Sequence, residues 1–422
     1  MTATPTAPTA PSSPRLGRPF LWLWNACAGS NLADGIYQVA LPVTAVHLGG
    51  GAGGVAMVAA MARVPWLLFA LFSGVLVDRL DERRLMRIVN SARVVILGAT
   101  ALALMTDRAG IALLAAAAFL LGIGETVFDT AFHTTTPSLV PPSLLERANS
   151  RLQAAEITTN QMAGPSVAGL LLGLSASIAF GTTAALYLAT VFLLMALPAA
   201  PSPPGHDGAA TAAHGQGSVL ADVRSGLRFL FSDTTLTVYA VGVGALNLAW
   251  AAVYAALPLL ALPPGPLGLS STAYGALLMV AGVSGLVVGL LAPLATTRLG
   301  NRVCMALGLA GMAIGFALPG ISPTPLVLGV GLGCTGLLIL VNVITVSYRQ
   351  RTVPRELLGR VTSAYRLIAF GCLPVGSALA GVVGTHHGPR AVLVLAGGVV
   401  LAAAVPMTLS ARSLAPHAPE TT

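Results

Sequence analysis

Long apolar segments separated by short charged loops dominate this sequence. Only 9% of its 422 residues are charged, and 55% are hydrophobic. A soluble domain of ordinary composition carries about 25% charged residues. A helix needs about 20 apolar residues to cross a bilayer, and these segments offer almost no polar face that could meet water. The sequence therefore predicts an integral membrane protein.

Loop residues divide the apolar part of the chain into twelve expected spans, six on each side of a polar Pro/Gly segment at 199–218. The fold class that we expect is an all-α membrane protein with twelve transmembrane helices in two pseudo-symmetric six-helix bundles. The expected spans are 20–47, 55–78, 86–106, 110–136, 148–173, 176–198, 233–261, 271–297, 302–321, 325–348, 360–384 and 389–410.

The domain organisation follows from these spans. Val219, Val223, Leu227 and Leu230 share one helical face, which predicts a short amphipathic helix on the inner membrane surface. The expected parts are a disordered cytoplasmic tail (1–19), an N-terminal bundle (20–198), a cytoplasmic linker with the amphipathic helix (199–232), a C-terminal bundle (233–411) and a second cytoplasmic tail (412–422).

Arginine placement predicts the orientation. All 22 basic residues are arginine, and 17 of them fall in the tails and loops on the side of the two termini. Only Arg108 and Arg390 fall in loops on the other side. The positive-inside rule therefore predicts cytoplasmic termini in a bacterial plasma membrane. It also explains the net charge of +8 without a nucleic-acid partner.

The two halves contain a weak internal repeat. Residues 140–150 (VPPSLLERANS) and 353–363 (VPRELLGRVTS) match at six of eleven positions, and both join the fourth and fifth expected helix of a half. A weaker similarity links YQVALP (37–42) with YAALP (254–258). Parallel repeats of this kind predict a pseudo-twofold axis along the membrane normal and a binding cavity between the halves.

Three segments carry a resemblance to a known family. They are GVLVDRLDERRLMR (74–87), GETVFDTAF (124–132) and NQMAGPSVAGLLLG (160–173). Together with the six-plus-six plan they resemble the major facilitator superfamily, drug:proton antiporter type, in the actinobacterial branch related to macrolide and siderophore exporters. The resemblance covers roughly residues 20–410.

The resemblance implies two motifs. The implied inner gate consists of Gly74, Asp78, Arg79 and Arg83, with Arg360 as the expected partner of Asp78. The implied antiporter motif consists of Gly164, Pro165 and Gly169, which would bend the fifth helix. The sequence departs from the family pattern at Asp81, Glu82 and Ala168, and Thr297 replaces the aspartate in the second half, so the gate is expected to be asymmetric.

Ionisable residues inside the expected spans are costly and usually functional. Glu125 and Asp129 are four residues apart and share one helix face, and Asp34 lies in the first span. We expect these three acids to handle protons. The open alternatives are a structural salt bridge with Arg63 or Arg93 for the acid pair, and a polar helix contact for Asp34. Glu156 is expected to pair with Arg151 or Arg93, and Arg366 to anchor the inner gate.

Four aromatic residues are candidates for stacking on a large ligand: Tyr37, Trp66, Trp250 and Tyr254. Plain packing is an equal alternative for Trp66 and Trp250.

No P-loop, nucleophile elbow or zinc-ligand set occurs in the sequence, so we expect no enzyme, no cofactor and no metal site. The expected function is a monomeric, proton-coupled antiporter that exports small amphipathic or lipophilic molecules across the lipid bilayer, with the proton gradient as energy source. Two alternatives remain open, namely a proton-coupled importer of the same fold and a transporter-like sensor that moves nothing.

Overall fold

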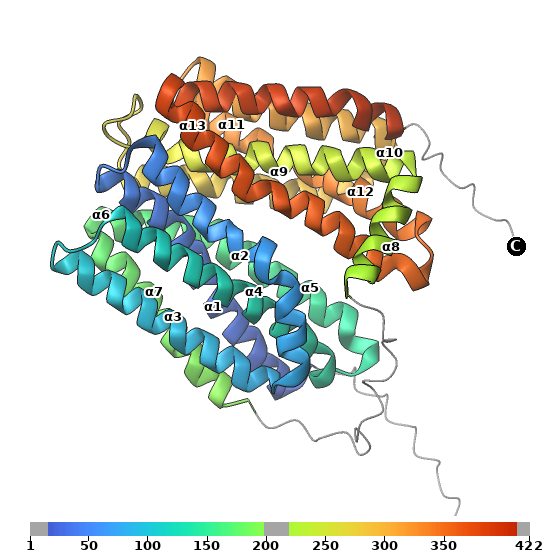
Figure 1. Cartoon of the computed structure of the whole chain (residues 1–422), viewed down its shortest axis with the longest axis horizontal. Coiled ribbons are helices and arrows are strands. Elements are labelled where there is room, and N and C mark those ends of the chain that lie inside the picture. The colour runs from blue at the N-terminus through green and yellow to red at the C-terminus, as the bar shows by residue number, and fades with distance from the viewer. Residues whose placement is uncertain (1–15, 198–218, 412–422) are drawn as a thin grey trace, which may run out of the picture.

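The computed structural model describes residues 16–197 and 219–411, and every regular element in these ranges is helical. Figure 1 shows α1 to α7 grouped together beside a second group formed by α9 to α13. The expected tails and most of the expected linker lie outside the described residues, namely 1–15, 198–218 and 412–422.

The helices follow the expected spans closely, with ends displaced by a few residues. In chain order they are α1 (Arg18–His47), α2 (Gly51–Arg79), α3 (Glu82–Met105), α4 (Ile111–Leu139), η1 (Pro142–Leu144), α5 (Leu145–Glu156), the π-helix η2 (Ile157–Ala163), α6 (Gly164–Leu174), α7 (Ala176–Met195), α8 (Val219–Ser232), α9 (Thr234–Ala261), α10 (Ser271–Ile321), α11 (Pro325–Thr335), α12 (Leu338–Thr352) and α13 (Arg355–Ser410).

Two of these helices each contain two expected spans. The backbone leaves the helical conformation at Gly300 in α10 (φ 78°) and at Gly388 in α13 (φ 77°). Glycine adopts this left-handed conformation without a steric penalty, so the chain reverses there within one residue. By length and hydropathy, eight helices among the described residues could cross a membrane, and α1 and the α5–η2–α6 run are not among them.

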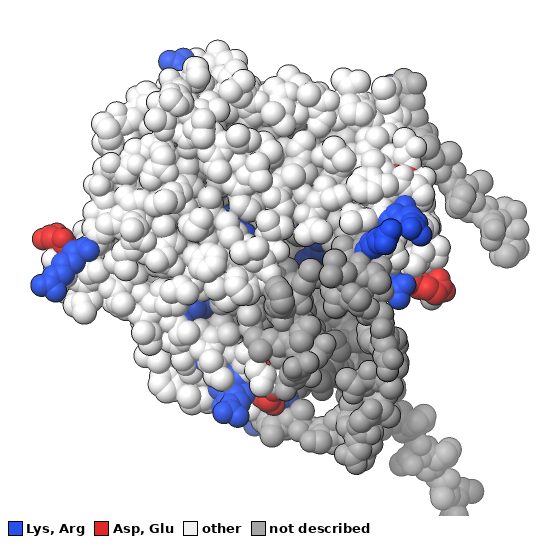
Figure 2. Space-filling view, viewed as in Figure 1, with Lys and Arg blue, Asp and Glu red and all other residues white. Residues whose placement is uncertain are grey.

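The outer surface fits a lipid environment. Large apolar side chains such as Leu174, Leu290 and Leu326 are more than 70% exposed. Figure 2 shows a face that is largely uncharged, with charged side chains gathered mainly at its margins. A soluble protein rarely exposes apolar surface on this scale, so this surface is consistent with burial in a bilayer.

We call the end of the molecule that holds Arg18 and Ala411 the terminal end. The helices alternate in direction, so the loops at 80–81, 140–144 and 353–354 lie at this end, while the loops at 48–50, 106–110 and 262–270 lie at the opposite end.

At the opposite end the two bundles meet backbone to backbone. Thr272 donates a hydrogen bond through Oγ1 to the carbonyl of Gly169 (3.2 Å). A Cβ added at Gly275 would lie 2.8 Å from the Cα of Gly169, and one added at Gly381 would lie 2.8 Å from the Cβ of Ala56. These distances leave no room for a side chain, because real Cβ contacts are longer. We call this contact the glycine seam.

A helix is present at the predicted place, as α8. It packs on α13, where Gly226 lies directly against the backbone of Arg360, and Leu230 is fully buried. The side chains of 219–223 lie outside the described part of the structure. The expected position of this helix on the inner membrane surface stays a prediction.

We expect Gly275→Leu to hold the glycine seam open, because the added side chain would collide with the backbone of Pro165 and Gly169. Spin labels on cysteines introduced at the exposed positions Leu174 and Leu326, one in each bundle, should report a longer distance in this variant.

Gly98→Leu is the matched control, since nothing lies within 4 Å of a Cβ at that exposed position of α3. An unchanged distance distribution in Gly275→Leu would show that the seam does not need the glycine.

Candidate functional site

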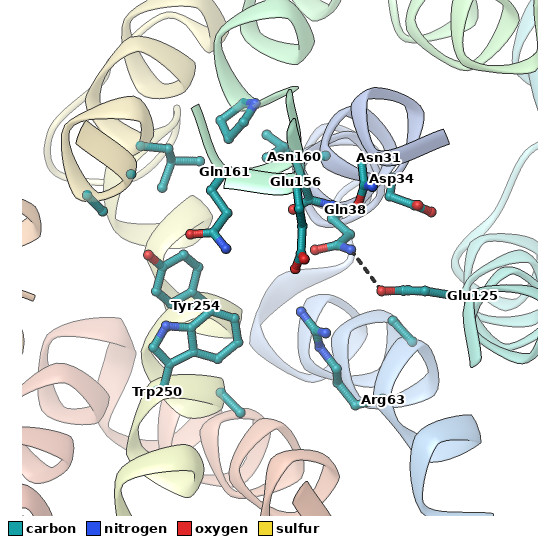
Figure 3. A pocket seen from close by; sticks show the side chains of 18 of the residues that line it. Asn31, Asp34, Gln38, Arg63, Glu125, Glu156, Asn160, Gln161, Trp250 and Tyr254 are labelled. Atoms are coloured by element: carbon teal, nitrogen blue, oxygen red, sulfur yellow. Dashed lines mark hydrogen bonds between the residues drawn. The ribbon is translucent and has the colours of Figure 1, made fainter. Parts of the chain in front are cut away.

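A cavity of about 910 Å³ lies between the two bundles. Helices α1, α2, α4, α5 and η2 line it from the first bundle, and α9, α10, α12 and α13 line it from the second (Figure 3). Its lining includes Asn149, an exposed residue near the terminal end, while the glycine seam closes the opposite end. The cavity therefore reaches the surface at the terminal end.

Asp34 on α1 is held by two partners inside the first bundle. Tyr187 on α7 donates a hydrogen bond to its Oδ1 (2.6 Å), and Nη1 of Arg93 on α3 lies 3.6 Å from the same oxygen. Arg93 is only 1% exposed and stacks over the rings of Tyr187 and Phe128, at 5.0 Å and 5.6 Å. Asp34 thus makes a buried ion pair as well as the polar helix contact considered from the sequence.

The sequence provides space for this arginine at Gly124. A Cβ at that position of α4 would lie 2.7 Å from Nε of Arg93, so any larger residue would displace the guanidinium. Nη1 of Arg93 also lies 3.5 Å from Oγ of Ser30 and 3.4 Å from Oδ1 of Asn90. Its Nε and Nη2 have no hydrogen-bond partner within the described chain. Only one of the three guanidinium nitrogens, Nη1, therefore has hydrogen-bond partners among the described residues.

Glu125 on α4 is held by α1. Tyr37 donates through its hydroxyl to Oε2 (2.6 Å). Gln38 donates through Nε2 to Oε1 (3.3 Å) (Figure 3). The arginine partner considered for this acid is absent, because the only ion pair among the described residues joins Arg93 and Asp34. Tyr37 lines the cavity as expected, but its hydroxyl is engaged with an acid.

Asp129 and Glu156 line the same cavity without a partner. Neither makes a hydrogen bond or an ion pair with any residue that the structure describes. The expected pairing of Glu156 with Arg151 or Arg93 is therefore not formed. Figure 3 shows the Glu156 side chain directed into the space between the bundles.

Two arginines line the cavity while resting on aromatic rings. Arg63 on α2 lies 5.5 Å from the ring centre of Trp250, and Arg366 on α13 lies 5.7 Å from that of Phe370. Trp250 stacks on Tyr254 with 4.2 Å between ring centres. Such cation–π contacts are worth about 0.5–2 kcal/mol, and they leave the guanidinium hydrogen-bond donors available.

The four expected aromatics all line the cavity: Tyr37, Trp66, Trp250 and Tyr254. Trp66 also contacts Phe370 of the second bundle, with 6.4 Å between ring centres. Trp66 and Trp250 therefore both line the cavity and pack against neighbouring side chains.

The antiporter-motif glycines lie where helices approach most closely. Gly164 packs on α1, since a Cβ there would lie 2.6 Å from the Cα of Gly35, and Gly169 belongs to the glycine seam. Gly164 is the first residue of α6 and Pro165 is the second, directly after the π-helix η2. The expected bend stays a prediction. π-Helical turns are often found at functional sites, and this one places Asn160 and Gln161 at the cavity.

The implied gate stays a prediction. Gly74, Asp78 and Arg79 lie on α2, but their side chains are outside the described part of the structure. Arg83 is 7% exposed, and its two terminal nitrogens have no hydrogen-bond partner among the described residues. Arg360 is exposed near the start of α13.

Comparison with known proteins agrees with this architecture. The family model described as "Transmembrane secretion effector" matches residues 8–417, which is nearly the whole chain. The chain belongs to this family of major facilitator superfamily transporters. The family assignment confirms the resemblance to the major facilitator superfamily.

Individual relatives are distant. An uncharacterised MFS-type transporter of Sinorhizobium fredii is 27% identical over 362 residues, 82% of this chain and 83% of that protein. The multidrug efflux pump Tap of Mycolicibacterium fortuitum is 26% identical over 410 residues, 93% of each chain. A mutant of the nucleoside transporter NupG has the same fold, with a TM-score of 0.76 at 14% identity over 93% of this chain and 100% of that one.

Arg93→Met should destabilise this transporter strongly, because it leaves Asp34 buried and unpaired. Removing one partner of a buried ion pair costs about 3–5 kcal/mol. The double variant Asp34→Asn/Arg93→Met should regain most of the loss. Thermal unfolding of the purified protein in detergent measures both effects.

Arg302→Met, at an exposed position of α10, serves as control and should shift stability by less than about 0.5 kcal/mol. If the double variant is no more stable than Arg93→Met, the arginine does not act through Asp34.

Proposed function

We propose that this transporter is a proton-coupled antiporter that exports small amphipathic or lipophilic molecules. The observation that carries the proposal is the group of carboxylates at the cavity, where Asp129 lies without a hydrogen bond or ion pair beside the hydrogen-bonded Glu125. The printed name of the relative Tap, a multidrug efflux pump, supports export of this kind of molecule.

A carboxylate without a partner inside a membrane protein is costly in its ionised form. Proton binding removes that cost, so such a group gains and loses a proton as its surroundings change between wet and dry. Asp129 lies within the electrostatic influence of Glu125, Asp34, Glu156 and Arg93. Protonation of Asp129 changes the electrostatic field at the charged groups around it.

In the proposed cycle the cavity accepts substrate from the terminal end, which arginine placement assigns to the cytoplasm. The glycine seam then opens as the bundles rock, and substrate leaves on the other side. Protons load the carboxylates from that side and are released inward, which resets the carrier. Moving one elementary charge across 100 mV supplies about 2.3 kcal/mol.

The alternatives differ in measurable ways. An importer of the same fold would move proton and substrate in the same direction, and a sensor would move no substrate. The cavity of about 910 Å³ with its aromatic wall favours a carrier over a sensor, because it has the size and lining of a small-molecule site.

The decisive measurement uses everted membrane vesicles with an acidic lumen and the lipophilic dye Hoechst 33342. An exporting antiporter should accumulate dye in the lumen as protons leave, and an uncoupler should abolish accumulation. Depletion of dye from the lumen would indicate symport.

Asp129→Asn should lower pH-gradient-driven accumulation by about tenfold or more, since it removes a proton-binding carboxylate. Asp107→Asn is the matched control, because the same change falls on an exposed loop residue at the opposite end. Equal transport in the two variants would remove Asp129 from the coupling mechanism.

A further inference from the structure

The charges that line the cavity carry information on the substrate. Asp34 is neutralised by Arg93, and Glu125 is hydrogen-bonded by Tyr37 and Gln38. The remaining charged lining residues are Asp129, Glu156, Arg63 and Arg366, two of each sign. None of these four forms an ion pair within the described residues.

Opposite charges therefore share one cavity without forming ion pairs with each other. Figure 3 shows the side chains of Arg63 on α2 and Glu156 on α5 entering the same space, beside the Trp250–Tyr254 pair. Free charges in a low-dielectric site favour a ligand that supplies the missing counter-charge. A ligand of only one sign would satisfy one wall and be repelled by part of the other.

We propose that the substrate of this transporter is amphoteric, with a cationic amine, an anionic group and an aromatic body in one molecule. The inference rests on the proposed export function and specifies its substrate class. The amine lies toward Glu156, the anionic group binds the guanidinium of Arg63, and the aromatic body lies against Trp250 and Tyr254.

The assignment of each pole follows from the chemistry of the walls. Arg63 presents a planar fork of donors that suits a carboxylate or phenolate oxygen. Its contact with the Trp250 ring does not use those donors. Glu156 is the last residue of α5, directly before the π-helix. Asn160 and Gln161 line the same cavity, and the oxygens of their amides add hydrogen-bond acceptors for an ammonium group.

The cavity has room for such a molecule together with water. Ligand sites for drug-sized molecules have volumes of about 300–1,000 Å³, and this cavity has about 910 Å³. The competing explanation is that Arg63 and Glu156, which both belong to the first bundle, pair with each other when their side chains adopt other rotamers. In that case a singly charged ligand would be transported as well as an amphoteric one.

Three probes with one fluorescent core separate these explanations. Norfloxacin carries an amine and a carboxylate, its ethyl ester keeps only the amine charge, and its N-acetyl derivative keeps only the carboxylate charge. In reconstituted vesicles with an imposed pH gradient, we expect kcat/KM for norfloxacin to exceed that of either derivative by about tenfold or more. Tenfold corresponds to about 1.4 kcal/mol.

Variants test which side chain binds which charged group of the substrate. Arg63→Gln should lower the preference for norfloxacin over its ester, whereas Glu156→Gln should lower the preference over the N-acetyl derivative. Arg63→Lys keeps the charge and should retain most of the first preference. Arg302→Gln, an exposed arginine of α10 outside the cavity lining, should leave both preferences unchanged.

The wild-type ranking decides the matter even if a cavity variant fails to fold. Equal transport of the three probes would overturn the proposal, and so would transport of Hoechst 33342 with none of the three, which would leave the export function intact. If neither the dye nor any probe moves, the proposed export function fails, and the amphoteric substrate fails with it.

Discussion

The cost of placing ionised groups within a bilayer governs the arrangement of this protein. The first bundle buries a complete guanidinium, Arg93, and stabilises it with Asp34, two aromatic rings and the space left by Gly124. This one interaction ties α3 to α1 and α7, since Tyr187 of α7 donates to the same carboxylate oxygen. The other charges inside the helices are tolerated because they line a cavity.

The fold was predictable because hydrophobic length and loop composition dominate it. Almost every helix end in the structure lies within a few residues of a span read from apolar runs, and α8 was visible from the spacing of four apolar residues. The π-helix was not predicted, since a wider turn leaves no signature in apolar periodicity. Glycine breaks at Gly300 and Gly388 coincide with expected loops, but there the chain reverses with a single non-helical residue.

The sequence was enough to predict which residues belong to the site, but not which partners they contact. Each intramembrane ion stands out in an apolar segment, so Asp34, Glu125 and Asp129 could be selected from sequence alone. Their partners depend on helix rotation and on which helices are neighbours. Tyr187 and Gln38 were missed for this reason, because a tyrosine or glutamine in an apolar helix carries no signal that tells a hydrogen-bond donor from an ordinary packed residue.

The distribution of contacts constrains how coupling can work. Asp34 with Arg93 and Tyr187, and Glu125 with Tyr37 and Gln38, are contained entirely within the first bundle. A rocking motion of rigid bundles would leave these contacts unchanged, so they cannot by themselves report which side is open. The second half contributes no carboxylate between Asp233 and Glu356, and it faces the cavity with Trp250, Tyr254 and Arg366.

The groups whose surroundings must change on rocking are therefore those that face the second bundle. These are the unpaired acids Asp129 and Glu156, and Arg63 through its contact with Trp250. Hydration of these groups differs between an open and a closed cavity, whereas Arg93 and Asp34 are buried within the first bundle. In the proposed cycle, proton release and substrate binding are thus coupled through the water and the ligand in the cavity, with the buried Arg93–Asp34 pair as a fixed electrostatic background.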